Sequence, residues 1–267
     1  PTRFSIVDTF GLDSRSLKYL TFIKDRRFSS EVQVSIVSLI HDGSNGYINQ
    51  YGDVNTSHDM GSFDFNISGT EGNLLFYPTK FSVNDYDVNT VSIDIKDTIV
   101  SVGSTNLGDS VFVGSATTSI PSGTSSATTV VGIASTYRSS KVLVQIGATD
   151  SSYQEFDEIT ILHDGTNIIL QEYGQLNTSN LESYSSLGIG TYHAYYSGSN
   201  INIDLIPYTS TPVQFDVNSV RVSISSTQSV GIGTEIFNNS RLESSYVAIS
   251  STPTPGITTV ASYNSIY

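Results

Sequence analysis

The chain of 267 residues contains no cysteine and no tryptophan, and only 12 lysines and arginines stand against 25 aspartates and glutamates. The absence of cysteine excludes disulfides, thiol catalysis and cysteine-based metal sites. The formal net charge is −13, and Lys24, Arg26 and Arg27 form the one basic cluster. Nucleic-acid binding needs concentrated positive charge, and anionic lipid repels an acidic surface, so neither nucleic acid nor a membrane is expected as a partner.

Long apolar runs and helical periodicity are also missing. No stretch approaches the ~20 consecutive apolar residues that span a bilayer, and no secretory signal is visible. No segment keeps a 3.6-residue period over three turns. Charged residues make up only 14% of the chain, whereas 16 tyrosines and 12 phenylalanines are present. Because disordered chains show the reverse balance, we expect a folded protein with a polar, weakly charged surface.

The strongest positive feature is an internal repeat. The segments HDGSNGYINQYGDVNTS (41–57) and HDGTNIILQEYGQLNTS (163–179) are identical at 9 of 17 positions, at an offset of 122. Further matches are RSLKYLTFI (15–23) with RSSKVLVQI (138–146), MGSFDFNISG (60–69) with IGTYHAYYSG (189–198), and DVNTVSIDI (87–95) with DVNSVRVSI (216–224). The last two matches have an offset of 129, which predicts a seven-residue insertion within SNLESYSS of the second copy.

The repeat predicts how the chain is organised. We expect an N-terminal arm (1–12), a β repeat unit one (13–97), a linker (98–135), a β repeat unit two (136–225), and a linker-like C-terminal segment (226–267) leading toward the position of a third unit. The linker is rich in Ser, Thr and Gly, but VFVG (111–114) and TTVVGIA (128–134) are strand-like. These patches are expected to pack along a neighbouring unit.

Apolar residues alternate with polar ones almost everywhere, which is typical of half-buried strands. Alternating sets are Val91, Ile93 and Ile95; Val220, Val222 and Ile224; and Ile201, Ile203 and Leu205. With about six or seven strands in each unit, the pattern predicts an all-β fold of two tandem homologous antiparallel β-sandwich or barrel-like units, joined by a partly strand-forming linker. Positions that are apolar in both copies are expected to form the core.

His163 and Asp164 in TILHDGTNIIL could form a metal site or an acid–base pair. Asp-Gly between two alternating apolar runs is, however, a strong signal for a tight hairpin whose central residues have positive φ. His41 is the repeat equivalent of His163. The hairpin interpretation is therefore favoured, and we expect the two histidines to have equivalent surroundings.

Two acidic clusters are the remaining candidates for chemistry: Asp85 with Asp87, and the group Glu155, Asp157 and Glu158. Paired carboxylates can cleave glycosides or bind calcium. The second cluster aligns with Gln33, Ser35 and Ile36, so a solvated strand face is favoured over a site. No G-x-S-x-G nucleophile motif is present. No catalytic, metal or cofactor-binding residue is predicted, and no cofactor is expected.

Tyrosines could instead form a platform for sugars. Tyr192 and Tyr196 align with Phe63 and Ile67, which predicts a core position for both. Tyr195 has the opposite phase, so it is the candidate for an exposed ligand-binding surface.

The pattern RSSK-VLVQI … EITILHDGTN … EYG … NTS … LGIGTYHAYYSG … INIDLIP … DVNSVRV resembles repeats in large virion structural proteins of marine tailed phages, particularly contractile-tailed phages of cyanobacteria. The resemblance covers both units. It implies a non-enzymatic component of the extracellular virion (head decoration, neck, tail or fibre) that binds other virion proteins and copies of itself as a homo-oligomer. The alternatives are an adhesin that binds host-surface glycan, and a glycan-degrading enzyme that uses the acidic clusters.

Overall fold

The computed structural model describes residues 4–28, 30–79, 85–96, 104–107, 111–178, 188–225, 234–237 and 240–243. These residues form β-strands in antiparallel sheets, so the predicted all-β class is confirmed. Among them there is no helix long and apolar enough to span a membrane. The segment SNLESYSS (179–186), in which the seven-residue insertion is predicted, and most of segment 226–267 lie outside the described residues.

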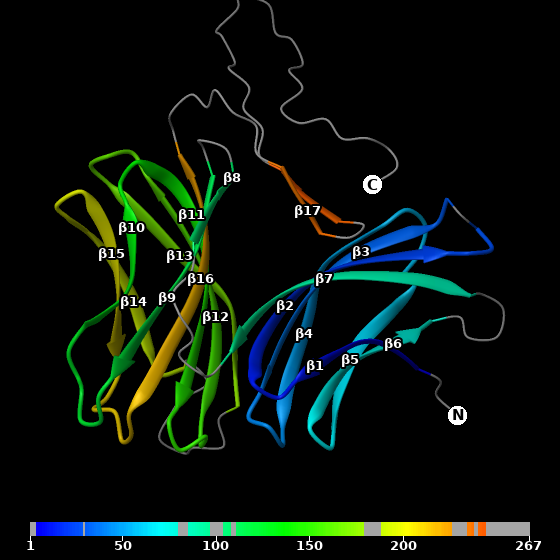
Figure 1. Ribbon diagram of the computed structural model, residues 1–267, viewed down its shortest axis with the longest axis horizontal. Helices are drawn as coiled ribbons and strands as arrows, with labels where there is room; N and C mark the ends of the chain where they lie inside the picture. Colours follow the sequence, from blue (N-terminus) through cyan, green and yellow to red (C-terminus); the bar gives the residue numbers. More distant parts are fainter. Residues whose placement is uncertain are drawn as a thin grey trace, which may run out of the picture.

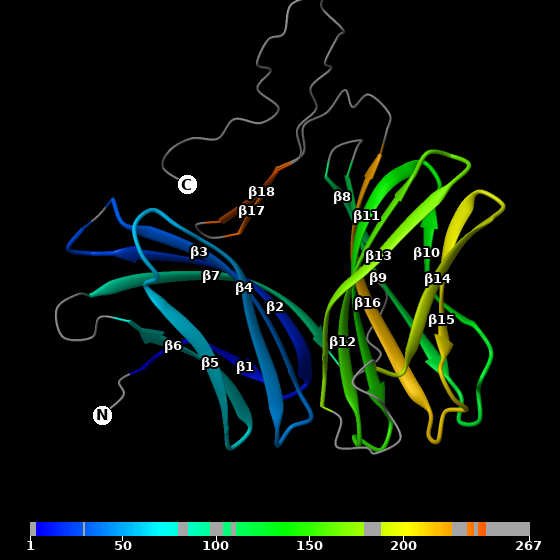
Figure 2. The same cartoon turned by 180° about the vertical axis from the view of Figure 1, so that it is seen from behind.

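A first sandwich consists of a four-stranded sheet, β4-β3-β2-β7, that packs on a three-stranded sheet, β1-β6-β5 (Figures 1 and 2). Its strands are β1 (Ser5–Gly11), β2 (Ser14–Asp25), β3 (Val32–His41), β4 (Gly46–Asn55), β5 (Gly61–Ser68), β6 (Glu71–Pro78) and β7 (Tyr86–Lys96). The core between the sheets is aromatic and aliphatic, with Leu17, Tyr19, Leu39, Leu74 and Phe76 almost fully buried.

A second sandwich consists of a six-stranded sheet, β13-β12-β11-β16-β9-β8, and a three-stranded sheet, β10-β15-β14. Its strands are β8 (Ser104–Leu107), β9 (Val111–Ile120), β10 (Thr128–Ala134), β11 (Tyr137–Ala148), β12 (Gln154–His163), β13 (Ile168–Asn177), β14 (Gly190–Ser197), β15 (Asn200–Pro207) and β16 (Phe215–Ser225). The predicted alternation of Ile201, Ile203 and Leu205 is confirmed, because all three are fully buried. Ile203 and Leu205 belong to the core between the two sheets. A separate hairpin, β17 (Thr234–Phe237) and β18 (Ser240–Glu243), follows.

Segments assigned from the sequence to an arm and a linker form strands of these sheets. Residues 5–11, within the expected arm, form β1 and pair with β6. Within the expected linker, β9 pairs with β16 and β10 pairs with β15. Each segment satisfies the backbone groups of a strand that would otherwise end its sheet, which is why polar Ser/Thr-rich sequence becomes ordered here.

The two sandwiches have the same strand register. Ser16 of β2 lies between Ile40 and Ile95, and Ser139 of β11 lies between Leu162 and Ile224. Bulges occur at aligned places, as in Val34/Ile36 of β3 and Phe156/Glu158 of β12. Positive-φ glycines also align: Gly43 with Gly165, Gly52 with Gly174, and Gly69 with Gly198. A register shift of one residue would exchange the two faces of a strand, so this agreement places equivalent side chains on equivalent faces.

The prediction that the alternating apolar residues of β7 and β16 face the core is wrong. Val91 and Ile224 are 44% and 50% exposed, because their alternating set lies on the outer face of the large sheet, away from the sandwich core. The inner face of β16 instead carries Phe215, Val217 and then polar residues. Arg221 is accommodated there because its guanidinium donates to the carbonyl of Gly132 and lies over the Phe112 ring.

A third apolar cluster joins the two sandwiches through these outer faces. Ile40 and Ile95 of the first sandwich pack with Leu143 and Phe156 of the second, and Leu176 and Val220 complete the cluster. We call Ile40 and Ile95, beside the β3–β4 hairpin, the tip surface of the first sandwich. We call Leu143, Phe156, Leu176 and Val220, toward the opposite end of the outer face, the base surface of the second.

Leu143 and Leu20 offer a direct test of this packing, because they occupy equivalent positions in β11 and β2. Leu143 is 5% exposed in the contact, whereas Leu20 is 54% exposed. Leu143→Ala should lower the free energy of unfolding by roughly 2–5 kcal/mol, as for buried leucines generally. Leu20→Ala, the matched control, should change it by less than about 0.5 kcal/mol. Urea unfolding of the monomeric chain at low protein concentration, followed by tyrosine fluorescence, measures both; equal losses would contradict the contact.

Candidate functional site

The hairpin that carries His163 and Asp164 is a structural cap. The residues 164–167 form a four-residue loop closed by the pair His163–Ile168. The Asp164 carboxylate accepts the backbone N–H groups of Thr166 and Asn167, each at 2.7 Å. These bonds, led by the one from Asn167, lower the pKa of Asp164 to about 2. Only Gly165 has positive φ, so the expected turn with two positive-φ residues is wrong, and the aspartate cap replaces it.

The two histidines make equivalent Nε2 bonds, whereas their Nδ1 partners differ. His163 Nε2 lies 2.8 Å from the carbonyl oxygen of Tyr137, and His41 Nε2 lies 2.9 Å from that of Ser14. A carbonyl only accepts, so Nε2 carries the proton and Nδ1 accepts in both rings. Nδ1 of His163 accepts from the Tyr196 hydroxyl (3.0 Å), and Nδ1 of His41 accepts from Gly43 N–H (3.1 Å). Both rings are buried and both nitrogens are used, as a structural role requires.

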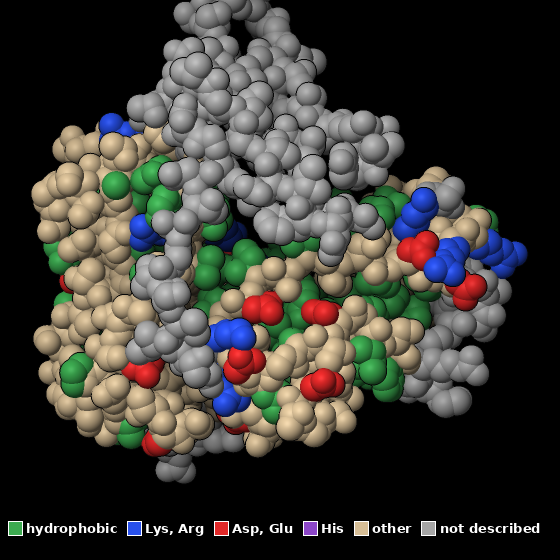
Figure 3. Space-filling model, viewed as in Figure 1, with side chains coloured by type: hydrophobic (Ala, Val, Ile, Leu, Met, Phe, Trp, Pro, Cys, Tyr) green, Lys and Arg blue, Asp and Glu red, His purple; other side chains and the backbone are tan. Residues whose placement is uncertain are grey.

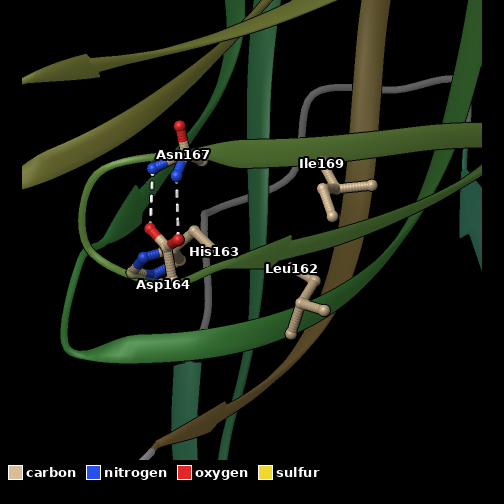
Figure 4. A pocket seen from close by; sticks show the side chains of 5 residues that line it. All are labelled: Leu162, His163, Asp164, Asn167 and Ile169. Atoms are coloured by element: carbon tan, nitrogen blue, oxygen red, sulfur yellow. Dashed lines mark hydrogen bonds between the residues drawn. The ribbon is translucent and has the colours of Figure 1, made fainter.

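Beside this hairpin lies a shallow hollow, lined by Leu162, His163, Asp164, Asn167 and Ile169 (Figure 4). In Figure 4, Asn167 is held by two bonds to Asp164, and Leu162 and Ile169 project side by side from neighbouring strands. The hollow therefore presents an apolar rim, and its polar side chains already have partners. Asp164 and Asn167 pair with each other, and His163 pairs with Tyr137 and Tyr196. Within the described residues, no group of three or more His, Asp or Glu is arranged to hold a metal.

The expectation that Glu155, Asp157 and Glu158 form a solvated strand face is wrong. All three are at most 1% exposed. Glu155 and Asp157 point into the core of the second sandwich, and Glu158 lies on the outer face, where the first sandwich covers it. Both faces of β12 are buried, which the alternation of a single strand does not reveal.

Glu155 and Asp157 complete a buried hydrogen-bond network. Glu155 accepts the backbone N–H of Ile189 at 2.9 Å, the amide of Gln175 at 2.9 Å and the hydroxyl of Tyr153. The Tyr192 hydroxyl donates to Asp157 at 2.7 Å. Burial, together with the negative charge of Glu155, raises the pKa of Asp157 well above its ordinary value. Burial also raises the pKa of Glu155, although the donors oppose it.

The first sandwich builds the same network from neutral side chains. Gln33, aligned with Glu155, accepts the backbone N–H of Met60 at 2.7 Å and donates to Ser35 at 3.1 Å. Met60 aligns with Ile189, and Ser35 with Asp157. Since neutral groups perform the same task in one sandwich, we infer that the carboxylates of the other serve first to anchor β14 to β12.

Glu158 bridges lysines from both sandwiches. Lys18 and Lys141, which align with each other, both pair with its carboxylate. The Tyr51 hydroxyl donates to Glu158 at 2.9 Å. Burial alone would raise the pKa of Glu158, but the bonds and charges of Lys141 and Lys18 outweigh it and lower the pKa. Sequence reasoning missed this bridge, although the alignment of Lys18 with Lys141 and of Tyr51 with Tyr173 was a visible signal.

The remaining candidates lie apart from one another. Asp85 is exposed, and Asp87 pairs with Arg26 at the surface. Tyr192 is buried, as predicted, whereas Tyr196 is half-buried against His163. Tyr195 is half-buried rather than fully exposed, and its ring stacks on exposed His193 at 5.9 Å. No known family model matches the sequence, and no curated protein does.

Replacing the charged network by its neutral counterpart tests its role. We expect the triple variant Glu155→Gln, Asp157→Ser and Tyr192→Phe to fold, because the first sandwich carries these residues. A carboxyl with a raised folded pKa loses its contribution to stability as the pH rises above about 4 toward that pKa. The variant should therefore gain roughly 1–3 kcal/mol over the parent at pH 8 and less at pH 5. Urea unfolding at both pH values measures this; a constant difference would contradict it.

The bridge at Glu158 gives a second prediction. Glu158→Gln leaves Lys18 buried without its counter-charge, so the free energy of unfolding should fall by roughly 3 kcal/mol. Adding Lys18→Met removes that charge and should recover most of the loss. Lys141→Met, at the aligned but half-exposed position, leaves Glu158 one lysine partner and should cost less than Glu158→Gln. If the double variant were no more stable than Glu158→Gln alone, the charge-pair explanation would fail.

Proposed function

We propose that this chain is a non-enzymatic structural component of a phage virion, in which two tandem copies of one β-sandwich unit act through protein–protein contacts. The observation that carries the proposal is the contact between the sandwiches: the outer face of one large sheet, with Leu143 and Phe156, is buried by the other sandwich. The sheets thus use their outer faces for packing between units, as a modular assembly requires.

The duplication is supported by the shared strand order and register of the two sandwiches. It is also supported by the equivalent bonds of His41 and His163 and by the Gln33 and Glu155 networks. The phage particle as the location is supported by the sequence resemblance. The structural role is supported by the buried, bonded state of the strongest chemical candidates in the described residues.

Purified particles test the proposal. Mass spectrometry of virions whose genome encodes this chain should detect it at many copies per particle, alongside the known shell or tail proteins. An averaged electron-microscopy map should then place repeated two-sandwich densities on the particle. Absence of the chain from intact, purified virions would overturn the virion proposal.

Glycan binding is a second candidate, favoured by the stacked pair His193 and Tyr195 at the surface. A ring pair at a sandwich edge is suited to an apolar sugar face. A glycan array should then give signals that Tyr195→Ala removes without changing the unfolding midpoint. An array without signal for the folded chain would exclude this candidate.

A further inference from the structure

The contact between the two sandwiches uses different surfaces on its two sides. The first sandwich contributes its tip surface, Ile40 and Ile95, and the second contributes its base surface, with Leu143 and Phe156. Such a contact is heterologous: each sandwich also has the surface that its neighbour uses. Because the registers agree, the unused surfaces can be assigned residue by residue.

The tip surface of the second sandwich is open. Leu162 aligns with Ile40 and Ile224 with Ile95, and both are 50% exposed, whereas Ile40 and Ile95 are at most 4% exposed. Ile169, the cross-strand partner of Leu162, is 63% exposed. The apolar rim seen in Figure 4 belongs to this surface.

The base surface of the first sandwich is open as well. Leu20 aligns with Leu143, Val91 with Val220 and Val54 with Leu176, and they are 54%, 44% and 69% exposed. The strand register places Leu20 between Ile36 and Val91, and Val34 between Phe22 and Val54, so these side chains form one continuous apolar surface. Hydrophobic side chains show at the surface in the angle between the sandwiches (Figure 3). Contiguous apolar patches of this kind mark interaction sites.

We propose that a second copy of this chain covers this surface: the tip surface of its second sandwich, Leu162 and Ile224, binds the base surface of the first sandwich, Leu20 and Val91. The contact repeats the one already made within each chain, so copies join head to tail. The inference rests on the proposed structural function and names the surfaces through which it acts.

Charge distribution fits this contact. Position 36 of the open base surface is isoleucine, whereas the aligned position in the filled one is Glu158. The incoming Lys141 would therefore meet an apolar residue in place of a carboxylate. Lys141 already pairs with Glu158 of its own sheet and donates to the Tyr173 hydroxyl at 3.0 Å, so it brings its counter-charge with it.

Strand pairing supports the same relation independently. The hairpin β8–β9 follows the first sandwich in the chain, and β9 pairs with the edge strand β16 of the second. Among the described strands, the equivalent edge strand β7 pairs with β2 alone. The hairpin β17–β18 follows the second sandwich as β8–β9 follows the first. By this place in the chain order, in a head-to-tail array it would extend the sheet of the next copy at β7 by strand addition.

Sedimentation velocity on paired variants tests the proposal. A base variant carries Leu20→Asp and Val91→Asp, a tip variant carries Leu162→Asp and Ile224→Asp, and Ile6→Asp, at an exposed strand position outside both surfaces, is the control. The parent and the control should form concentration-dependent multiples of 28.8 kDa. Either variant alone should associate roughly 30-fold more weakly or worse, as when an interface hot spot is lost.

The mixture of the two variants is the decisive sample. Each variant retains one intact surface, so a 1:1 mixture should yield a complex of two chains and no larger species. If the mixture stayed monomeric while the parent assembled, the contact would not be heterologous and the proposal would fall. The proposal would also fall if the parent were monomeric. In that case, a lower unfolding midpoint for the base variant would show that the chain covers this surface itself.

This experiment separates the inference from the proposed function. If association depends on these surfaces but the chain is absent from virions, the virion role is overturned and the contact is kept. A chain abundant in virions, whose association ignores the substitutions, would keep the role and overturn the contact.

Discussion

Each large sheet has to cover apolar side chains on two faces, and this requirement shapes the rest of the molecule. The inner face is covered by a three-stranded sheet, which completes a sandwich. The outer face has apolar residues at both its tip and its base. Within one chain, a single tip is placed on a single base, with Ile40 and Ile95 against Leu143 and Phe156. Burial of such area is favourable by roughly 25 cal/mol per Å², so the uncovered tip and base surfaces favour further association.

Polar groups add specificity to this packing. Glu158 pairs with a lysine from each sandwich, so a placement of the two sheets that separates Lys18 from Glu158 leaves a buried charge without this partner. A buried ion pair contributes little net stability compared with apolar packing, but it penalises wrong placements strongly. In the first sandwich, isoleucine replaces this glutamate. The base surface of the first sandwich is therefore more apolar and restricts the angle between the packed sheets less, which suits a contact between separate copies.

Much of the fold follows from alternation and the repeat. The strands, the hairpins and the equivalence of His41 with His163 could all be predicted, because they depend on local periodicity and turn residues. The face that each strand buries could not be predicted in the same way. Val91 and Ile224 alternate like core residues, yet they face outward, because a sheet covered on both sides has two apolar faces.

The acidic residues of β12 show the same limit. Glu155 and Asp157 align with neutral residues, which indicated a solvated face, but the neutral Gln33 and Ser35 are themselves buried and bonded. These polar side chains accept hydrogen bonds from the backbone just before the next strand, as Gln33 does from Met60 and Glu155 from Ile189. Their polarity therefore indicates hydrogen bonding and does not indicate exposure. The bridge from Lys18 to Glu158 depends on tertiary placement of two sandwiches, which no local pattern contains.

A cryo-electron-microscopy structure of the assembled chain tests the central claim most directly. The account predicts Leu162 and Ile224 of one copy on Leu20 and Val91 of the next, with the same relative orientation as the two sandwiches within a chain. Copies related by a two-fold axis through identical surfaces, or an assembly that leaves both surfaces in solvent, would contradict it.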